Sequence, residues 1–175
     1  MNAREWRTVW RAADERLLVE ARDEDGWVRH RTRTNEFGDG SVVIVRRGDR
    51  MLFVGADRQA VGRSLVELPR GQADASDVDP VDTARRELLE ETGRVLGTAD
   101  VLGQIYPESG LNGDAVNVVL GYEGSALPAA EAEYAEQFWL TSEDVRRGIA
   151  EGSIRDGITI SALALCWAVA KTPEA

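Results

Sequence analysis

The sequence contains one cysteine, one histidine and no long apolar or basic run, and each shortage excludes a class of protein. Cys166 has no second cysteine for an internal disulfide, which fits a reducing, cytoplasmic setting. His30 lies in a basic, strand-like run, and we expect it on the surface. The most apolar stretch, residues 158–170, is too short to span a bilayer. We therefore expect a core helix there and no membrane partner.

Basic charge is also scarce, because 21 lysine and arginine residues face 31 acidic ones, giving a net charge of −10. This balance, without a basic run, argues against nonspecific binding to nucleic acid. An anionic substrate would need local attraction from bound metal and from a few arginines, since distant surface charge is largely screened at physiological salt. The candidates are Arg58, Arg63 and Arg70.

The chain lacks internal repeats, low-complexity tracts and proline-rich linkers. Its 175 residues, 43% of them hydrophobic, suffice for one good core and are few for two. Residues 1–38 form an N-terminal β segment in this interpretation, with one or two short strands between Arg4 and Arg33 that turn at Asp25-Gly26. Residues 39–175 form the main domain.

Strand and helix signals in the main domain predict an α/β fold. A hairpin turns at Gly48-Asp49, an acidic helix covers residues 80–92, a helix runs from Thr141 to near Gly152, and an apolar helix starts near Thr159. The expected strands are residues 41–46, 51–54, 65–68, 101–106, 115–122 and 138–140. Together they predict a mixed β-sheet between helices, an α/β/α sandwich.

Three carboxylates gather near the end of the acidic helix. Asp79 suits its N-cap, Pro80 its first turn and Gly93 its left-handed exit, so both helix ends are well specified. A stripe of Val81, Ala84, Leu88 and Leu89 faces the core. Beside that stripe lie Glu87, Glu90 and Glu91.

These glutamates repel one another, at a cost of about 0.2–0.5 kcal/mol for each pair one turn apart. They also face the negative end of the helix dipole. A solvated surface helix is the simpler interpretation of an acidic cluster. A divalent cation that prefers oxygen ligands, Mg²⁺ or Mn²⁺, would remove both penalties, and we favour it because the helix ends hold the cluster in place.

The segment from Gly71 to Gly93 resembles the signature of the Nudix hydrolases, G-x5-E-x7-R-E-U-x-E-E-x-G-U, where U is a bulky apolar residue. The matching residues are Gly71, Arg86, Glu87, Leu88, Glu90, Glu91 and Gly93. The resemblance implies an α/β/α sandwich, metal binding by the three glutamates and a supporting role for Arg86. One extra residue precedes Arg86, so the first glutamate of the signature falls on Asp77 or on Val78, and its last apolar position is Arg94.

Within this family the chain is similar to the ADP-ribose pyrophosphatase group. Residues 67–71 resemble that group's Glu-Leu-Pro-Ala-Gly run, and residues 152–159 resemble its C-terminal segment. The resemblance implies hydrolysis of ADP-ribose to AMP and ribose 5-phosphate, and a homodimer in which the segment around Trp6 and Trp10 exchanges between subunits. It also implies substrate contacts from Arg58, Glu67, Arg70 and Gly71. An upstream Arg-Gln pair of the group is replaced by Gly55-Ala56.

The group that accepts the proton from water stays open at this stage. The resemblance implies a carboxylate in the loop after the signature, which is Asp114, with Glu108 as a substitute. The glutamates of the acidic helix are the alternative. Two other functions also stay open: hydrolysis of a different nucleotide, such as a sugar nucleotide, a dinucleoside polyphosphate or a nucleoside triphosphate, and nucleotide sensing without turnover.

Overall fold

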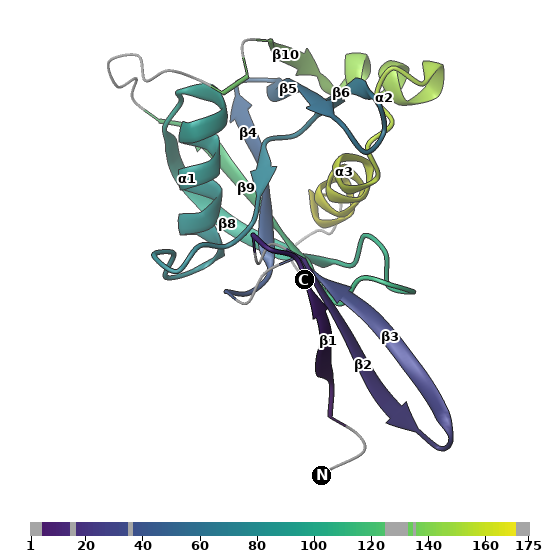
Figure 1. The fold of residues 1–175 in the computed structure, drawn as a ribbon. Coiled ribbons are helices and arrows are strands. Elements are labelled where there is room, and N and C mark those ends of the chain that lie inside the picture. The colour runs from purple at the N-terminus through teal and green to yellow at the C-terminus, as the bar shows by residue number, and fades with distance from the viewer. Residues whose placement is uncertain (1–4, 15–16, 35–36, 125–132, 135, 171–175) are drawn as a thin grey trace.

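The chain folds into a main domain with a small sheet projecting from it (Figure 1). The computed structural model describes residues 5–14, 17–34, 37–124, 133–134 and 136–170. Its small antiparallel sheet contains β1 (Arg7–Arg11), β2 (Leu18–Glu24) and β3 (Trp27–Arg33). Within these residues no helix combines the length and apolar character needed to cross a membrane.

The main sheet is mixed, as predicted. Its strands follow the order β10-β5-β4-β9-β8, β6 pairs with β5 and β7 with β4. The pairing of β4 with β9 is parallel and the other pairings are antiparallel. The strands are β4 (Gly40–Arg47), β5 (Arg50–Arg58), β6 (Arg63–Glu67), β7 (Arg70–Gly71), β8 (Leu96–Ile105), β9 (Val116–Glu123) and β10 (Gln137–Thr141).

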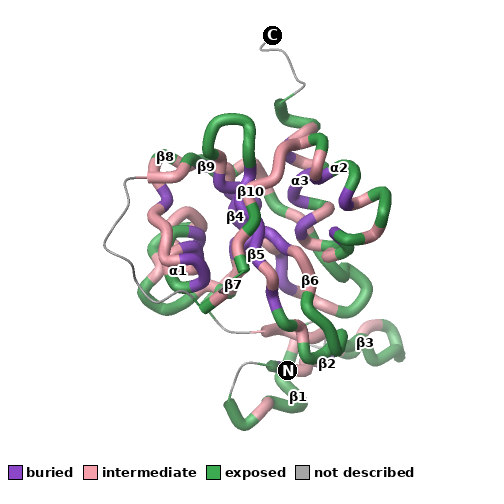
Figure 2. The backbone as a smooth tube through the Cα atoms, turned by 90° about the horizontal axis from the view of Figure 1, so that it is seen from above, coloured by how far each residue is buried: buried purple, intermediate pink, exposed green. Residues whose placement is uncertain are grey.

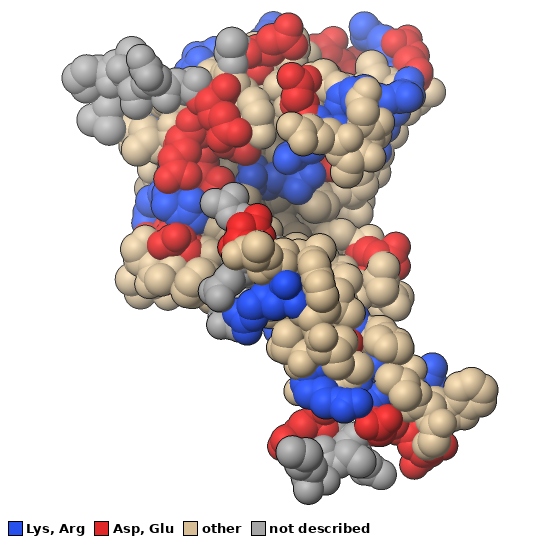
Figure 3. Space-filling model, in the orientation of Figure 1, with Lys and Arg blue, Asp and Glu red and all other residues tan. Residues whose placement is uncertain are grey.

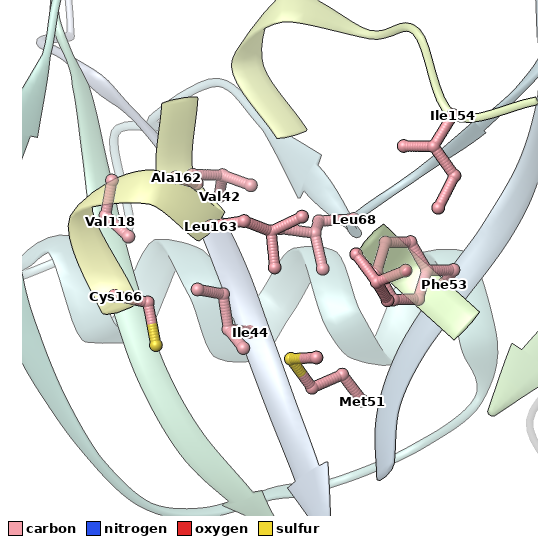
Figure 4. Close-up of a cluster of buried hydrophobic side chains, with 11 residues drawn as sticks. Val42, Ile44, Met51, Phe53, Leu68, Val118, Ile154, Ala162, Leu163 and Cys166 are labelled. Carbon is pink, nitrogen blue, oxygen red and sulfur yellow. The ribbon is translucent and has the colours of Figure 1, made fainter. Parts of the chain in front are cut away.

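Helices cover both faces of this sheet (Figure 2). Successive side chains of a strand point to opposite faces, so β4 sends Val42 and Ile44 into one core cluster and Val43 and Val45 into the other. The helix α1 (Pro80–Thr92) packs on the second cluster. The helices α2 (Ser142–Glu151) and α3 (Gly157–Ala170) pack on the first, shown in Figure 4. This arrangement confirms the α/β/α sandwich.

The predicted helix ends are confirmed by their caps. Asp79 accepts hydrogen bonds from the N–H groups that follow it, Pro80 begins α1, and Gly93 ends it with a φ of 67°. The capping box of Thr141 and Asp144 starts α2. Because these signals act between neighbours in the chain, the sequence alone specifies where the acidic helix lies.

Several predicted strands and helices need correction, and the strand expected at residues 51–54 continues to Arg58. The N-terminal segment contains three strands instead of one or two. The prediction missed a strand because β1 is exposed at every position and shows no alternation of buried and exposed residues. The turn at Asp25-Gly26 is confirmed, with φ values of 49° and 85°, whereas Arg4 lies outside the described residues. The strand β8 begins at Leu96 instead of Val101, since two irregularities in register interrupt its pattern. The last helix begins two residues earlier than expected, at Gly157.

Candidate active site

The acidic end of α1 and the glycine turn after β6 border one pocket. This pocket of about 610 Å³ is the acidic pocket hereafter. Figure 3 shows acidic side chains gathered over α1 with basic ones beside them. Its lining includes the three predicted glutamates, Glu87, Glu90 and Glu91, together with Arg86, Gly71 and Gln72.

Glu91 is the most buried of the three glutamates, with 5% of its surface exposed. Its carboxylate accepts a hydrogen bond from the N–H of Arg70 at 3.2 Å. Burial raises the pKa of Glu91 to about 8, and the charge of Glu87 acts in the same direction against the Arg70 N–H. Without a cation, burial therefore favours the neutral form of this carboxyl.

Arg86 joins the other two glutamates. Its Nη1 donates to Glu87 at 2.8 Å and to Glu90 at 3.1 Å. Burial raises the pKa of Glu87, opposed by Arg86, whereas the side chain of Glu90 is 55% exposed. A Cβ atom on Gly71 would overlap the Glu87 carboxylate, so the close approach of the turn to α1 requires glycine at this position.

The structure decides which residue replaces the first glutamate of the signature. Asp77 accepts hydrogen bonds from Nε and Nη2 of Arg86 at 3.2 and 3.0 Å, and 7% of its side chain is exposed. These bonds lower the pKa of Asp77. Val78, the other candidate, is 87% exposed. The extra residue in the loop therefore brings Asp77 to the arginine, so the contact is made in spite of the altered spacing.

The oxygen donors of the acidic pocket fit a divalent cation. Among the described residues, no three acidic, histidine or cysteine side chains stand in a ready-made metal-binding group. The guanidinium of Arg86 instead bridges Glu87 and Glu90. Burial raises the pKa of Glu87 and of Glu91, so a bound cation would favour their charged forms, and carboxylates prefer Mg²⁺ or Mn²⁺ over softer metals.

The predicted substrate contacts Arg58, Glu67 and Arg70 lie together. Glu67 is fully buried, and its carboxylate pairs with Arg58 at 2.6 Å and with Arg70 at 3.0 Å. The Glu67 bonds raise the pKa of Arg58. Arg70 also pairs with Asp156 at 3.4 Å. The network fixes both arginines beside the glycine turn, whereas Arg63 is exposed at the start of β6.

Asp114 lies apart from the acidic pocket. It lines a smaller pocket of about 180 Å³, the side pocket, which shares Gly71 and Gln72 with the acidic pocket. Thr34 contributes to the same wall. Glu108, the substitute suggested by the sequence, is exposed in the loop, where it accepts the N–H of Gly110. Neither loop carboxylate is therefore among the residues that line the acidic pocket.

Glu133 and Tyr134 are among the lining residues of the acidic pocket that carried no sequence signal. The N–H groups of Glu133 and Tyr134 donate to the carbonyls of Glu90 and Glu91, both at 3.0 Å, which places the two residues at the end of α1. Burial and the charge of Glu91 raise the pKa of the Tyr134 hydroxyl. No motif surrounds these residues, so only the fold reveals them.

Known proteins share sequence and fold with this chain. The model of the NUDIX domain matches residues 36–158. An ADP-ribose pyrophosphatase from Mycobacterium tuberculosis is 30% identical over 148 residues, which cover 82% of this chain and 72% of that protein. An ADP-ribose pyrophosphatase from Bacillus subtilis is 28% identical over 130 residues, covering 72% of this chain and 70% of that protein.

A solved structure described as an ADP compounds hydrolase has the same fold. It superposes with a TM-score of 0.75 at 17% identity and covers 96% of this chain and 92% of its own.

Proposed function

Since this chain belongs to the Nudix family, we propose that it hydrolyses the diphosphate bond of a nucleoside diphosphate linked to a second group. The proposed substrate is ADP-ribose and the proposed products are AMP and ribose 5-phosphate. The observation that carries this proposal is the acidic pocket, in which Glu87, Glu90 and Glu91 lie beside the glycine turn. The two relatives named as ADP-ribose pyrophosphatases support the substrate.

Three glutamates would hold the cation in this proposal: Glu87, Glu90 and Glu91. When bound, Mg²⁺ or Mn²⁺ neutralises diphosphate oxygens and lowers the pKa of a water molecule. Arg86 orients Glu87 and Glu90 through the hydrogen bonds of its Nη1, and Asp77 holds Arg86 from the other side. The N–H of Arg70 holds the Glu91 carboxylate.

The arginines next to the glycine turn would bind the anionic substrate. Arg58 and Arg70 are each anchored by the buried Glu67, so their guanidinium groups lose little conformational entropy on binding. Gly71, which has no Cβ, lets the Glu87 carboxylate lie against the turn where the diphosphate would bind. The proton acceptor in this scheme belongs to a set of four carboxylates: Glu87, Glu90, Glu91 and Asp114.

A different nucleotide is the second candidate substrate. The Arg-Gln pair of the ADP-ribose pyrophosphatase group is replaced by Gly55-Ala56, and a Cβ on Gly55 would lie 2.8 Å from the Glu136 carboxylate. A larger residue therefore has no room there. The remaining alternative, nucleotide sensing without turnover, is less well supported, because Asp77 supplies the arginine contact that the altered motif put in question.

A substrate panel tests the proposal. The purified protein would be incubated with Mg²⁺ and ADP-ribose, ADP-glucose, NADH, a diadenosine polyphosphate or nucleoside triphosphates, with products identified by mass spectrometry. We expect AMP and ribose 5-phosphate from ADP-ribose and loss of both in Glu91→Gln. Preference for another compound would change the substrate, and no product with Mg²⁺ or Mn²⁺ would favour sensing.

We further propose a cytoplasmic homodimer. The small N-terminal sheet exposes large apolar side chains, among them Trp10 at 52% and Trp27 at 72%, which a second subunit would cover. Residues 1–38 are the proposed dimerising segment. Light scattering of the intact protein and of Trp10→Ser with Trp27→Ser tests this proposal, which predicts a dimer that the double substitution weakens.

A further inference from the structure

The loop between β8 and β9 is attached to the edge of the N-terminal sheet. The N–H of Thr32 donates to the carbonyl of Leu111 at 2.8 Å, and the N–H of Gly113 donates to the carbonyl of Thr32 at 2.9 Å. Thr32 and Asn112 form a parallel β-bridge. The loop thus pairs with the edge strand β3, and these backbone hydrogen bonds hold the loop in place.

Gly113 allows a close approach between the loop and β3. A Cβ atom at this position would lie 2.9 Å from Cδ of Arg31 and 3.3 Å from Cδ of Arg33. Any larger residue would therefore have to displace these arginine stems. The next residue, Asp114, accordingly lies directly against the end of β3.

The carboxylate of Asp114 is occupied by this junction. Its Oδ2 accepts the N–H and the hydroxyl of Thr34, both at 2.6 Å. Its Oδ1 lies 2.6 Å from Nε of Arg33, and 9% of the side chain is exposed. The backbone N–H of Asp114 donates to Oδ1 of Asn112 at 2.9 Å, which also holds the backbone of Asp114 in place. Residues 33–34 thus contact the carboxylate on both sides, with hydrogen bonds to Oδ2 and an ion pair at Oδ1 whose geometry is not that of a hydrogen bond.

This junction forms a wall of the side pocket. Thr34, Asn112 and Asp114 line that pocket together with Gly71 and Gln72 of the glycine turn. Among the described residues that line the acidic pocket, Asp114 is absent. The position of Asp114 thus affects the shape of a space that adjoins the three glutamates.

We propose that Asp114 is a positioning residue, which holds the wall of the side pocket against the end of β3 and does not accept the proton during hydrolysis. This inference rests on the proposed function and deepens it. The water oxygen bonds to one phosphorus, and the bridging P–O bond breaks with its electron pair on the departing phosphate. The proton of the water passes to one of the glutamates of the acidic pocket: Glu87, Glu90 or Glu91.

The junction can be tested without turnover. Amide hydrogen exchange would be followed at Thr34 and Gly113 in the intact protein, in Asp114→Ala and in Asp49→Asn, whose aspartate lies in the exposed β4–β5 turn. We expect exchange at both amides to accelerate at least about tenfold in Asp114→Ala alone. Unchanged protection of Thr34 in Asp114→Ala would overturn the proposal.

The kinetic test separates positioning from proton transfer. In Asp114→Asn we expect KM to rise about 3–10-fold, while kcat stays within about threefold and keeps its pH dependence. Thr34→Val and Arg33→Ala should raise KM in the same way, because they remove the partners of the carboxylate. A fall in kcat of about 10²–10⁴-fold in Asp114→Asn, with normal kcat in the two partner variants, would identify Asp114 as the proton acceptor and refute the inference.

The two proposals fail in different ways. If the intact protein hydrolyses no nucleotide, the proposed function fails, and hydrogen exchange still decides whether Asp114 holds the junction. If it hydrolyses a nucleotide and kcat depends on Asp114 as described, the inference fails while the function stands.

Discussion

Replacing Asp77 with alanine should loosen the loop that carries the glycine turn. The Asp77 carboxylate binds Nε and Nη2 of Arg86 at 3.2 and 3.0 Å, and it also accepts the N–H of Asp74 at 2.9 Å. Arg86 holds Glu87 and Glu90 at the same time. The substitution therefore removes the link between the loop and the arginine that orients two of the glutamates.

The expected loss is about 1–2 kcal/mol of unfolding free energy. A hydrogen bond to a charged group contributes about 1.5–3 kcal/mol, and this pair is mostly buried. We expect a value around the lower limit of that range because Arg86 keeps Glu87, Glu90 and the carbonyl of Gln72 as partners. If the same free energy is lost from holding Glu87 and Glu90 in their active positions, hydrolysis should slow about 5–30-fold.

Urea unfolding at pH 7 and the rate of hydrolysis measure the two effects. Val78→Ala is the matched control, because the neighbouring side chain is 87% exposed and should change neither quantity. Asp77→Glu should recover part of both. The pKa of Asp77 is lowered by the Arg86 bonds, so the stabilisation is present above the unfolded pKa of about 3.9 and is lost as the pH falls through the folded value. The difference between the protein and Asp77→Ala should accordingly shrink in acid.

Equal stability of Asp77→Ala and the unchanged protein at pH 7 would refute this reasoning. A larger effect from Val78→Ala would do so as well, since it would mean that the loop places Val78 and not Asp77 at the arginine.

Three further predictions concern the pocket and its supports. Gly71→Ala should lower kcat at least about tenfold, because its Cβ displaces the Glu87 carboxylate, whereas Gly157→Ala, with open space around it, should not. The pKa of Glu91 is about 8 in the folded protein and about 4.3 in the unfolded chain. Its contribution to the unfolding free energy of the metal-free protein is therefore fully present below about pH 4.3 and is lost as the pH rises towards 8. Between about pH 5 and 8 the unfolding free energy should therefore fall more steeply in the unchanged protein than in Glu91→Gln. Equal slopes of unfolding free energy against pH in the two proteins would contradict this prediction. Glu67→Gln should cost about 3 kcal/mol in urea unfolding, because the fully buried carboxylate balances two arginines, and a loss below about 0.5 kcal/mol would show that the pairing does not stabilise the fold.

The sequence by itself determined the parts of this protein that depend on near neighbours. The ends of α1 follow from Asp79, Pro80 and Gly93, and the start of α2 follows from the capping box at Thr141. The short continuous apolar run of β4, Val42 to Val45, predicted a strand buried on both faces of the sheet. The three glutamates reach one pocket because helical spacing puts them on one side of α1, and that spacing is visible in the sequence.

Only the tertiary structure decided which residues from distant parts of the chain meet. Spacing alone left Asp77 and Val78 equal, and the loop's path brings Asp77 to Arg86. The sequence suggested that Asp114 activates water, yet the end of β3 and the residue after it, about 80 residues earlier, bring Arg33 and Thr34 to its carboxylate. The third N-terminal strand escaped prediction because an exposed strand has no buried face to impose alternation. Such contacts depend on how sheets and loops pack in space, and packing over long sequence separations leaves no periodic pattern in the chain.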